Sequence, residues 1–285
     1  MSDQIERVGV IGAGQMGAGI AEVSARAGVD VMVYEPTEAL TTTGTARITK
    51  SLERGVSVGK ITERECTAAL AKLKFTTSLA DLSDRQLVIE AVIEDETVKR
   101  KIFAELDKLI TDPDAVLASN TSSIPIMKIA AATQNPGRVL GLHFFNPVPL
   151  MKLVEVVQSI LTEDATVAAA YEWVQAVGKV PVKTKDSTAF IVNRLLVPYL
   201  LDAIREYERG LGTIEDIDKG MKLGCGHPMG PFTLLDFVGL DTTYYIANIM
   251  FEEFREPRFA PPPLLKRMVL AGYHGRKTKR GFYTY

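Results

Sequence analysis

The stretch Val8-Gly-Val-Ile-Gly-Ala-Gly-Gln-Met-Gly-Ala-Gly19 decides the fold of this 285-residue chain. An apolar run leads into a turn in which Gly12, Gly14 and Gly17 have G-x-G-x-x-G spacing. Glycine-rich turns are common, so the spacing alone is a weak signal. The context supports it, because a strand is predicted over residues 5–11 and a helix over residues 15–27. A turn of this spacing between a strand and a helix indicates a dinucleotide-binding site.

Each glycine of the motif has its own physical reason. Gly12 permits the tight turn, Gly14 lets a pyrophosphate approach the backbone, and Gly17 allows the helix to pack closely on the strand. Gln15 and Met16 lie at the start of the helix, where free backbone N–H groups face phosphates. A strand–helix turn without a ligand is the alternative.

A carboxylate stands where such a site needs one. Glu35 follows a second predicted strand at residues 30–34 and lies 23 positions after Gly12. We expect it to accept hydrogen bonds from the adenosine ribose hydroxyls and to repel a 2′-phosphate, which favours NAD over NADP. A solvated carboxylate at the end of a strand is the alternative.

The composition is that of an ordinary globular protein, with 46% hydrophobic and 24% charged residues. Lys and Arg total 33 against 35 Asp and Glu, so a net charge of -2 offers no global field for nucleic acid or an anionic membrane. No apolar run is long enough to span a bilayer, and the first residues show neither a secretory signal nor a mitochondrial presequence. Cys66 and Cys225 lack metal-ligand spacing. We expect a cytoplasmic protein with reduced thiols and no metal site.

The chain changes character near residue 186. Before it, apolar β-branched runs alternate with helical patterns, which is typical of parallel βαβ units. We predict a Rossmann-type, doubly wound and mostly parallel α/β sheet over residues 1–186 and an all-helical C-terminal domain over residues 187–285. The further predicted strands are residues 87–92, 115–118, 138–145, 152–157 and 180–184, and the further helices of the first domain are residues 37–55 and 96–110.

One helix of the second domain suggests an interface. It is predicted over residues 188–209, with Asp186 and Ser187 as N-cap residues, and it is apolar almost all round. Such a helix is normally buried between partners, and Pro198 inside it predicts a kink or a local irregularity. Because one small domain can hardly cover this surface, we expect a homodimer in which the helical domains pack together.

His143 and Glu155 are titratable residues set in apolar strands. If these strands form an antiparallel hairpin turned by residues 146–150, a register centred on Pro149 places positions 143 and 155 directly opposite. Glu155 would then orient the imidazole and stabilise its charged form, and His143 would exchange the proton that hydride transfer from an alcohol releases. A structural pair that satisfies two buried polar groups is the alternative.

Two further polar features have open interpretations. Residues 119–123 (SNTSS) follow a predicted strand at the edge where doubly wound sheets place ligands. They either hold a substrate or the nicotinamide, or cap a helix that starts near Ile124. Asn193 lies in an otherwise apolar helical turn and needs a partner from the core or from a ligand, with the structural role favoured by the residues alone.

Five segments together resemble the 3-hydroxyacyl-CoA dehydrogenase family. They are Gly12-Ala-Gly-Gln-Met-Gly17, Ser119-Asn-Thr-Ser-Ser123, Gly141-Leu-His-Phe-Phe-Asn-Pro-Val-Pro149, Phe190-Ile-Val-Asn-Arg-Leu-Leu196 and Pro228-Met-Gly-Pro-Phe232. The resemblance covers nearly the whole chain, and the family's short-chain branch, which acts on 3-hydroxybutyryl-CoA, is similar in length. It implies an oxidoreductase of fatty-acid or butanoate metabolism that interconverts (S)-3-hydroxyacyl-CoA and 3-oxoacyl-CoA with NAD.

The resemblance also implies roles for residues at matching positions. His143 matches the catalytic histidine, Glu155 its partner carboxylate, and Ser122 and Asn193 the residues that position the substrate oxygens. Contacts with NAD are implied for Glu94, Lys99, Ser122, Asn146 and Lys277. Lys50 and Arg54 are candidates for the acyl-CoA phosphates, with solvated helix charges as the alternative. Glu35 stands where many relatives carry Asp, which leaves the strictness of NADP rejection open.

Two other classes of function remain as alternatives. A non-enzymatic NAD-binding relative is disfavoured by the intact pair of His143 and Glu155. A 2-hydroxyacid-type dehydrogenase with a lysine base predicts a lysine within residues 190–201, where this chain has Asn193. We expect the active site in a cleft between the two domains, with His143 taking the 3-hydroxyl proton as hydride leaves C3 for NAD.

Overall fold

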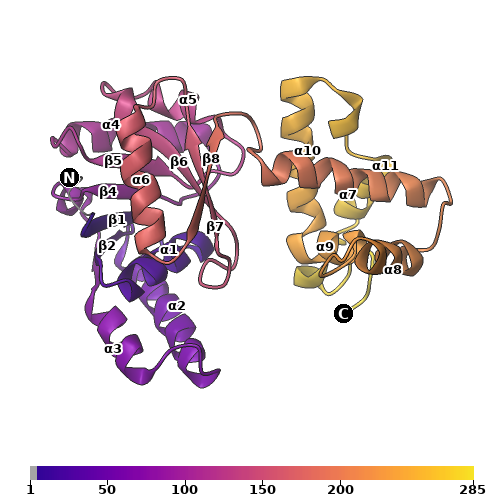
Figure 1. Ribbon diagram of the computed structural model, residues 1–285, viewed down its shortest axis with the longest axis horizontal. Helices are drawn as coiled ribbons and strands as arrows, with labels where there is room; N and C mark the ends of the chain where they lie inside the picture. Colours follow the sequence, from indigo (N-terminus) through magenta and orange to yellow (C-terminus); the bar gives the residue numbers. More distant parts are fainter. Residues whose placement is uncertain (1–4) are drawn as a thin grey trace. The chain divides into compact units, whose positions relative to one another are not determined.

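The computed structural model describes residues 5–285, so the first four residues of the predicted first domain lie outside the described part. The chain divides into two compact units, the first ending at Ser187 and the second running from Thr188 to Tyr285. Figure 1 shows that the first unit is a sheet flanked by helices and that the second is helical. This confirms the predicted fold class.

The sheet of the first unit has eight strands in the order β3-β2-β1-β4-β5-β6-β7-β8. The strands β1 to β6 run parallel, β7 is antiparallel to β6, and β8 is parallel to β7. Their bounds are β1 Arg7–Ile11, β2 Asp30–Tyr34, β3 Leu73–Thr76, β4 Leu87–Glu90, β5 Val116–Ser119, β6 Val139–Phe144, β7 Leu153–Gln158 and β8 Val180–Lys185. Because β1 has β2 on one side and β4 on the other, the winding reverses there, and ligands of such sheets bind outside the carboxyl ends at this point.

Helices cover both faces of the sheet. They are α1 Gln15–Arg26, α2 Glu38–Ser57, α3 Glu63–Ala71, α4 Glu96–Leu109, α5 Ile126–Ala130 and α6 Asp164–Ala176, with 3-10 turns at Leu79–Leu82 and Pro136–Arg138. The helices α1 and α6 pack on one face, α2 and α3 lie against α1, and α4 and α5 cover the other face.

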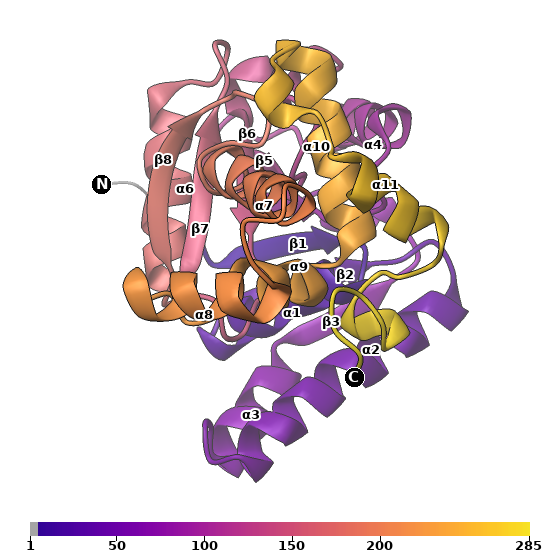
Figure 2. The same ribbon diagram turned by 90° about the vertical axis from the view of Figure 1, so that its right-hand side faces the viewer.

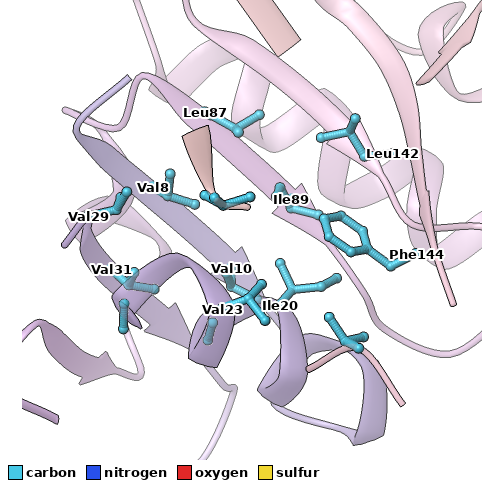
Figure 3. Packing of buried hydrophobic residues seen from close by; sticks show 14 of the residues in the cluster. Val8, Val10, Ile20, Val23, Val29, Val31, Leu87, Ile89, Leu142 and Phe144 are labelled. Atoms are coloured by element: carbon cyan, nitrogen blue, oxygen red, sulfur yellow. The ribbon is translucent and has the colours of Figure 1, made fainter. Parts of the chain in front are cut away.

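The core between α1 and the sheet determines where the strands end. Figure 3 shows Val8 and Val10 of β1 beside Ile20 and Val23 of α1, with Phe144 of β6 in the same cluster. All five side chains are buried. Burial of one such side chain contributes about 1.5–3 kcal/mol, so the cluster holds the ends of β1 and β6 in a defined place.

The second unit is built on its own apolar core. Figure 2 shows α7 beside α9 and α10, whose buried side chains form one cluster. The elements are α7 Val192–Glu208, α8 Ile214–Gly224, α9 Pro231–Val238, α10 Leu240–Phe254 and α11 Pro263–Leu270, with 3-10 turns at Pro257–Phe259 and Arg276–Thr278. The buried Asp236 ties down the last residues by accepting hydrogen bonds from the N–H groups of Phe282 and Tyr283. No helix of residues 5–285 has both the length and the apolarity that crossing a membrane requires.

The sequence patterns do not predict β3, α3 or α6, and they place the start of one helix wrongly. The strand β3 is absent from the predicted strands because it lies at the edge of the sheet and has no continuous apolar run. The helix expected from residue 188 begins at Val192, since Ala189 and Phe190 have φ angles of 69° and 49°. Asp186 therefore does not cap it, and accepts hydrogen bonds from two backbone N–H groups at the start of α5 instead.

Within one chain this helix is only partly covered, and its burial against a partner copy stays a prediction. Five side chains of α7 form a buried stripe, whereas Leu195 on another side is 66% exposed. Pro198 lies inside the helix, in the buried stripe. The helix is thus amphipathic in one copy of the chain, with apolar surface left uncovered.

Candidate active site

The glycine-rich turn lies between β1 and α1. A Cβ atom at Gly12 would lie 2.9 Å from the Ala91 carbonyl oxygen, and one at Gly17 would collide with the Gly12 carbonyl oxygen. Gly12 also has a φ of +91°, a conformation that favours glycine. A Cβ at Gly14 would meet no atom within 4 Å. The tight turn and the close packing are therefore confirmed, and Gly14 faces open space.

A cavity of about 620 Å³ opens beside this turn and is lined by the first unit alone. Gly12, Gly14, Gln15, Met16 and Glu35 line it, together with Ile11, Tyr34, Pro36, Ala91, Val92, Ile93, Val98 and Ile102. The N–H groups of residues 15–17 at the start of α1 form no hydrogen bond within the described part of the chain. An apolar wall, a carboxylate and free N–H groups suit the base, the ribose and the pyrophosphate of a dinucleotide.

The Glu35 carboxylate is held against the turn. Its Oε1 accepts a hydrogen bond of 2.5 Å from the Ala13 N–H, and the Ala13 carbonyl oxygen accepts one from Arg47 of α2. Arg47 was not among the predicted residues, because an arginine within a long helix has no signal of its own. The carboxylate is thus at the place where the sequence predicts a ribose acceptor.

His143 and Glu155 face each other across the β6–β7 hairpin. The register pairs His143 with Glu155 directly, which confirms the predicted pairing. His143 Nδ1 lies 2.6 Å from Glu155 Oε2, and both side chains are buried, at 6% and 0% exposure. The Phe145 ring centroid lies 4.5 Å from that of His143. A carboxylate at Nδ1 fixes the orientation of the ring.

The serine-rich segment after β5 is organised by Glu94. Its Oε1 accepts hydrogen bonds from the Thr121 hydroxyl, the Ser122 N–H and the Ser123 N–H and hydroxyl, at 2.5 to 3.1 Å. Because α5 begins only at Ile126, without a side-chain cap, the segment is not the N-cap of that helix. The Ser122 hydroxyl forms no hydrogen bond within residues 5–285.

The charge of Glu94 depends on opposing effects. Burial raises the pKa of its carboxyl, but the Lys99 charge and the hydrogen bonds from Thr121, Ser123 and Ser122 outweigh burial. The pKa therefore lies below its ordinary value. Glu94 is a carboxylate at neutral pH and accepts all of these hydrogen bonds.

Lys99 belongs to a buried network rather than to the surface of the cavity. It is 1% exposed, and its ammonium lies 2.6 Å from Glu90 Oε1 and 3.4 Å from Glu94 Oε2. Glu90 also accepts a hydrogen bond from the Ser119 hydroxyl. Sequence reasoning did not single out Glu90, although an acidic residue at the end of an apolar strand is the signal that identified Glu35.

The remaining predicted residues lie apart from this network. Lys50 and Arg54 are on the exposed side of α2, and neither lines the cavity beside the glycine turn. Asn146 is the second residue after β6 and precedes a cis proline. Asn193 and Lys277 belong to the second unit, Asn193 in the first turn of α7 and Lys277 2.5 Å from Asp241 Oδ2. Their predicted contacts with cofactor and substrate stay predictions.

Two family models together match nearly the whole chain. The model of the 3-hydroxyacyl-CoA dehydrogenase NAD binding domain matches residues 7–187, and that of the 3-hydroxyacyl-CoA dehydrogenase C-terminal domain matches residues 190–285. The chain is 65% identical to 3-hydroxybutyryl-CoA dehydrogenase of Mycobacterium tuberculosis, covering 100% of both, and 48% identical to that of Bradyrhizobium diazoefficiens, covering 100% and 97%.

Solved structures agree with this result. The crystal structure of FadB2 of M. tuberculosis has 65% identity and a TM-score of 0.97, covering 99% of this chain and 100% of that one. The crystal structure of (S)-3-hydroxybutyryl-CoA dehydrogenase PaaH1 from Ralstonia eutropha has 43% identity and a TM-score of 0.95, covering 99% of each chain.

Proposed function

This chain belongs to the 3-hydroxyacyl-CoA dehydrogenase family, and from that premise we propose that it interconverts (S)-3-hydroxybutyryl-CoA and acetoacetyl-CoA with NAD. The observation that carries the proposal is the buried pair of His143 and Glu155, joined at 2.6 Å. A buried histidine held by a carboxylate is suited to exchange a proton with an alcohol as hydride leaves or arrives.

The proton is moved by His143. With Nδ1 held by Glu155, Nε2 is the ring nitrogen that exchanges a proton with the substrate oxygen. In the oxidative direction neutral His143 takes the proton of the 3-hydroxyl, and Glu155 stabilises the imidazolium that forms. In the reductive direction protonated His143 returns the proton to the former ketone oxygen. Ser122 is proposed to hold that oxygen in place, and the contact of Asn193 with the substrate stays a prediction from the sequence.

The cofactor is held in the cavity beside the glycine turn. Bound NAD supplies the acceptor and donor of hydride. Glu35, which lines this cavity, would accept hydrogen bonds from the adenosine ribose, and the N–H groups at the start of α1 would bind the pyrophosphate. Glu94 and Asn146 are proposed for the nicotinamide half, with Lys99 acting from its buried position through Glu94. Lys50 and Arg54 are proposed for the phosphates of the acyl-CoA, and the contact of Lys277 with NAD stays a prediction from the sequence.

The assembly is proposed from the apolar surface of the helical unit. Ile191 just before α7 and Leu195 on it are exposed, as is Leu223 at the end of α8. Covering these side chains in a homodimer would remove them from water. The cytoplasmic location stays a prediction from the sequence.

Oxidation of NADH in the presence of acetoacetyl-CoA tests the proposal. We expect turnover with acetoacetyl-CoA, and an efficiency that falls as the acyl chain lengthens. A folded protein that binds NADH but does not oxidise it with any 3-oxoacyl-CoA would support the non-enzymatic alternative instead. Higher efficiency with long chains would contradict the short-chain proposal alone.

A further inference from the structure

We propose that Glu90 is a positioning residue for the reaction. Glu90 holds the Lys99 ammonium, and Lys99 in turn fixes the Glu94 carboxylate. That carboxylate accepts a hydrogen bond from the Ser122 N–H. This inference rests on the proposed function, because Ser122 matters to turnover only if it holds the substrate oxygen. Glu90 is the last residue of β4, at the carboxyl edge of the sheet.

Glu90 is completely buried, and three groups bond to its two oxygens. Oε1 accepts hydrogen bonds from the Lys99 ammonium at 2.6 Å and from the Val92 N–H at 2.7 Å. Oε2 accepts one of 2.7 Å from the Ser119 hydroxyl, whose oxygen in turn accepts the Thr121 N–H at 3.3 Å. A buried carboxylate needs such compensation, and here the compensating groups lead into the serine-rich segment.

A second route runs through Glu94, whose two oxygens have different partners. Oε2 faces the Lys99 ammonium at 3.4 Å, while Oε1 accepts from the N–H groups of Ser122 and Ser123 at 3.0 and 3.1 Å. Lys99 is almost fully buried, so the two carboxylates determine where its ammonium lies. If the charge of Glu90 is removed, the ammonium is drawn toward Glu94, and the carboxylate that carries the Ser122 segment is displaced.

Stability alone does not account for this network. Replacing a buried ion pair by neutral side chains often leaves the stability unchanged or higher. The pair of Glu90 and Lys99 is instead connected to every residue of the segment 121–123. Displacement of a positioning group by about 1 Å can lower turnover about a hundredfold, so a rigid support has a large effect on rate.

The first test is non-additivity with Ser122. With NADH at saturating concentration, so that cofactor binding does not enter, we expect Glu90→Gln to lower kcat/KM for acetoacetyl-CoA about tenfold to a hundredfold. In a Ser122→Ala background, Glu90→Gln should lower kcat/KM by less than about threefold, because the hydroxyl that Glu90 positions is gone. Lys99→Met, a second variant of the same network, should behave in the same way. Equal losses in both backgrounds would overturn the proposal.

Asp107→Asn is the matched control. Asp107 is a carboxylate at 5% side-chain exposure in a buried ion pair with Arg138, on the same helix as Lys99. It therefore reports the general effect of neutralising a buried carboxylate. We expect Asp107→Asn to change Tm about as much as Glu90→Gln does. Its loss in kcat/KM should be smaller, and it should add to the loss caused by Ser122→Ala. A non-additive loss with Ser122→Ala in this control would also overturn the proposal.

A second measurement does not depend on activity. Deuterium exchange at the Ser122 and Ser123 N–H groups should be about tenfold faster in Glu90→Gln and Lys99→Met, and unchanged in Asp107→Asn. Unchanged exchange in both network variants would overturn the proposal. If the unmodified protein does not reduce acetoacetyl-CoA, the proposed function fails, while the exchange rates still decide whether Glu90 holds the segment.

Discussion

Replacing Glu155 by Gln removes one charge from the buried pair and keeps its shape. The amide oxygen of Gln can still accept the hydrogen bond from His143 Nδ1, which is 2.6 Å long in the unmodified protein. The hairpin register that brings the two residues together is made by backbone hydrogen bonds and does not depend on the charge. The change therefore isolates the electrostatic support that Glu155 gives to protonated His143.

The size of the effect follows from the nature of this bond. A hydrogen bond with a charged partner contributes about 1.5–3 kcal/mol, and a neutral one about 0.5–1.5 kcal/mol. The charge of Glu155 thus contributes about 1 kcal/mol to this hydrogen bond, and it acts more strongly on the protonated imidazole than on the neutral ring. The side chains are almost fully buried, so water screens the pair little.

The assay is the pH dependence of kcat/KM in both directions. Reduction of acetoacetyl-CoA needs protonated His143, so its rate declines as the pH rises, and in Glu155→Gln the decline begins at lower pH. Oxidation of 3-hydroxybutyryl-CoA needs neutral His143, so its rate rises with pH, and the rise also begins at lower pH. Both profiles therefore move in the same direction.

Two outcomes would refute this reasoning. Unchanged profiles in Glu155→Gln, with the fold intact by circular dichroism, would mean that the charge of Glu155 does not act on the group that titrates. A displacement toward higher pH would mean that the essential proton resides on another residue. Glu22→Gln, a change at another buried carboxylate of the same unit, is the control and should leave both profiles in place.

Three further outcomes are expected. His143→Gln should lower turnover by about two to four orders of magnitude. A fluorescence titration should show nearly unchanged NADH binding, because the cavity at the glycine turn is separate from His143. Weak NADH binding would contradict this. The unmodified protein should have a higher kcat/KM with NADH than with NADPH, and Glu35→Gln should narrow the ratio of these two values. Equal kcat/KM values in the unmodified protein would contradict the role of Glu35. Sedimentation at micromolar concentration should show a dimer, and a species of only 31.2 kDa would refute the proposed assembly.

The sequence alone determined the features that depend on short stretches of chain. The glycine spacing around Gly12 defines a turn whose geometry is local, and the apolar runs of the parallel strands identify the α/β fold. The pairing of His143 with Glu155 was also predictable, because a hairpin between neighbouring segments fixes its own register once the turn is placed.

Only the tertiary structure decided the contacts between distant segments. The acidic Glu90 and the cation Lys99 each have several possible partners in the sequence, and packing of α4 on the sheet selects the pair that forms. Likewise Asp186 reads as the cap of the helix that follows it, yet folding places it at the start of α5, 60 residues earlier. Hydrogen bonds and charges are satisfied by whichever groups the apolar core brings together, and that selection is not contained in any local pattern.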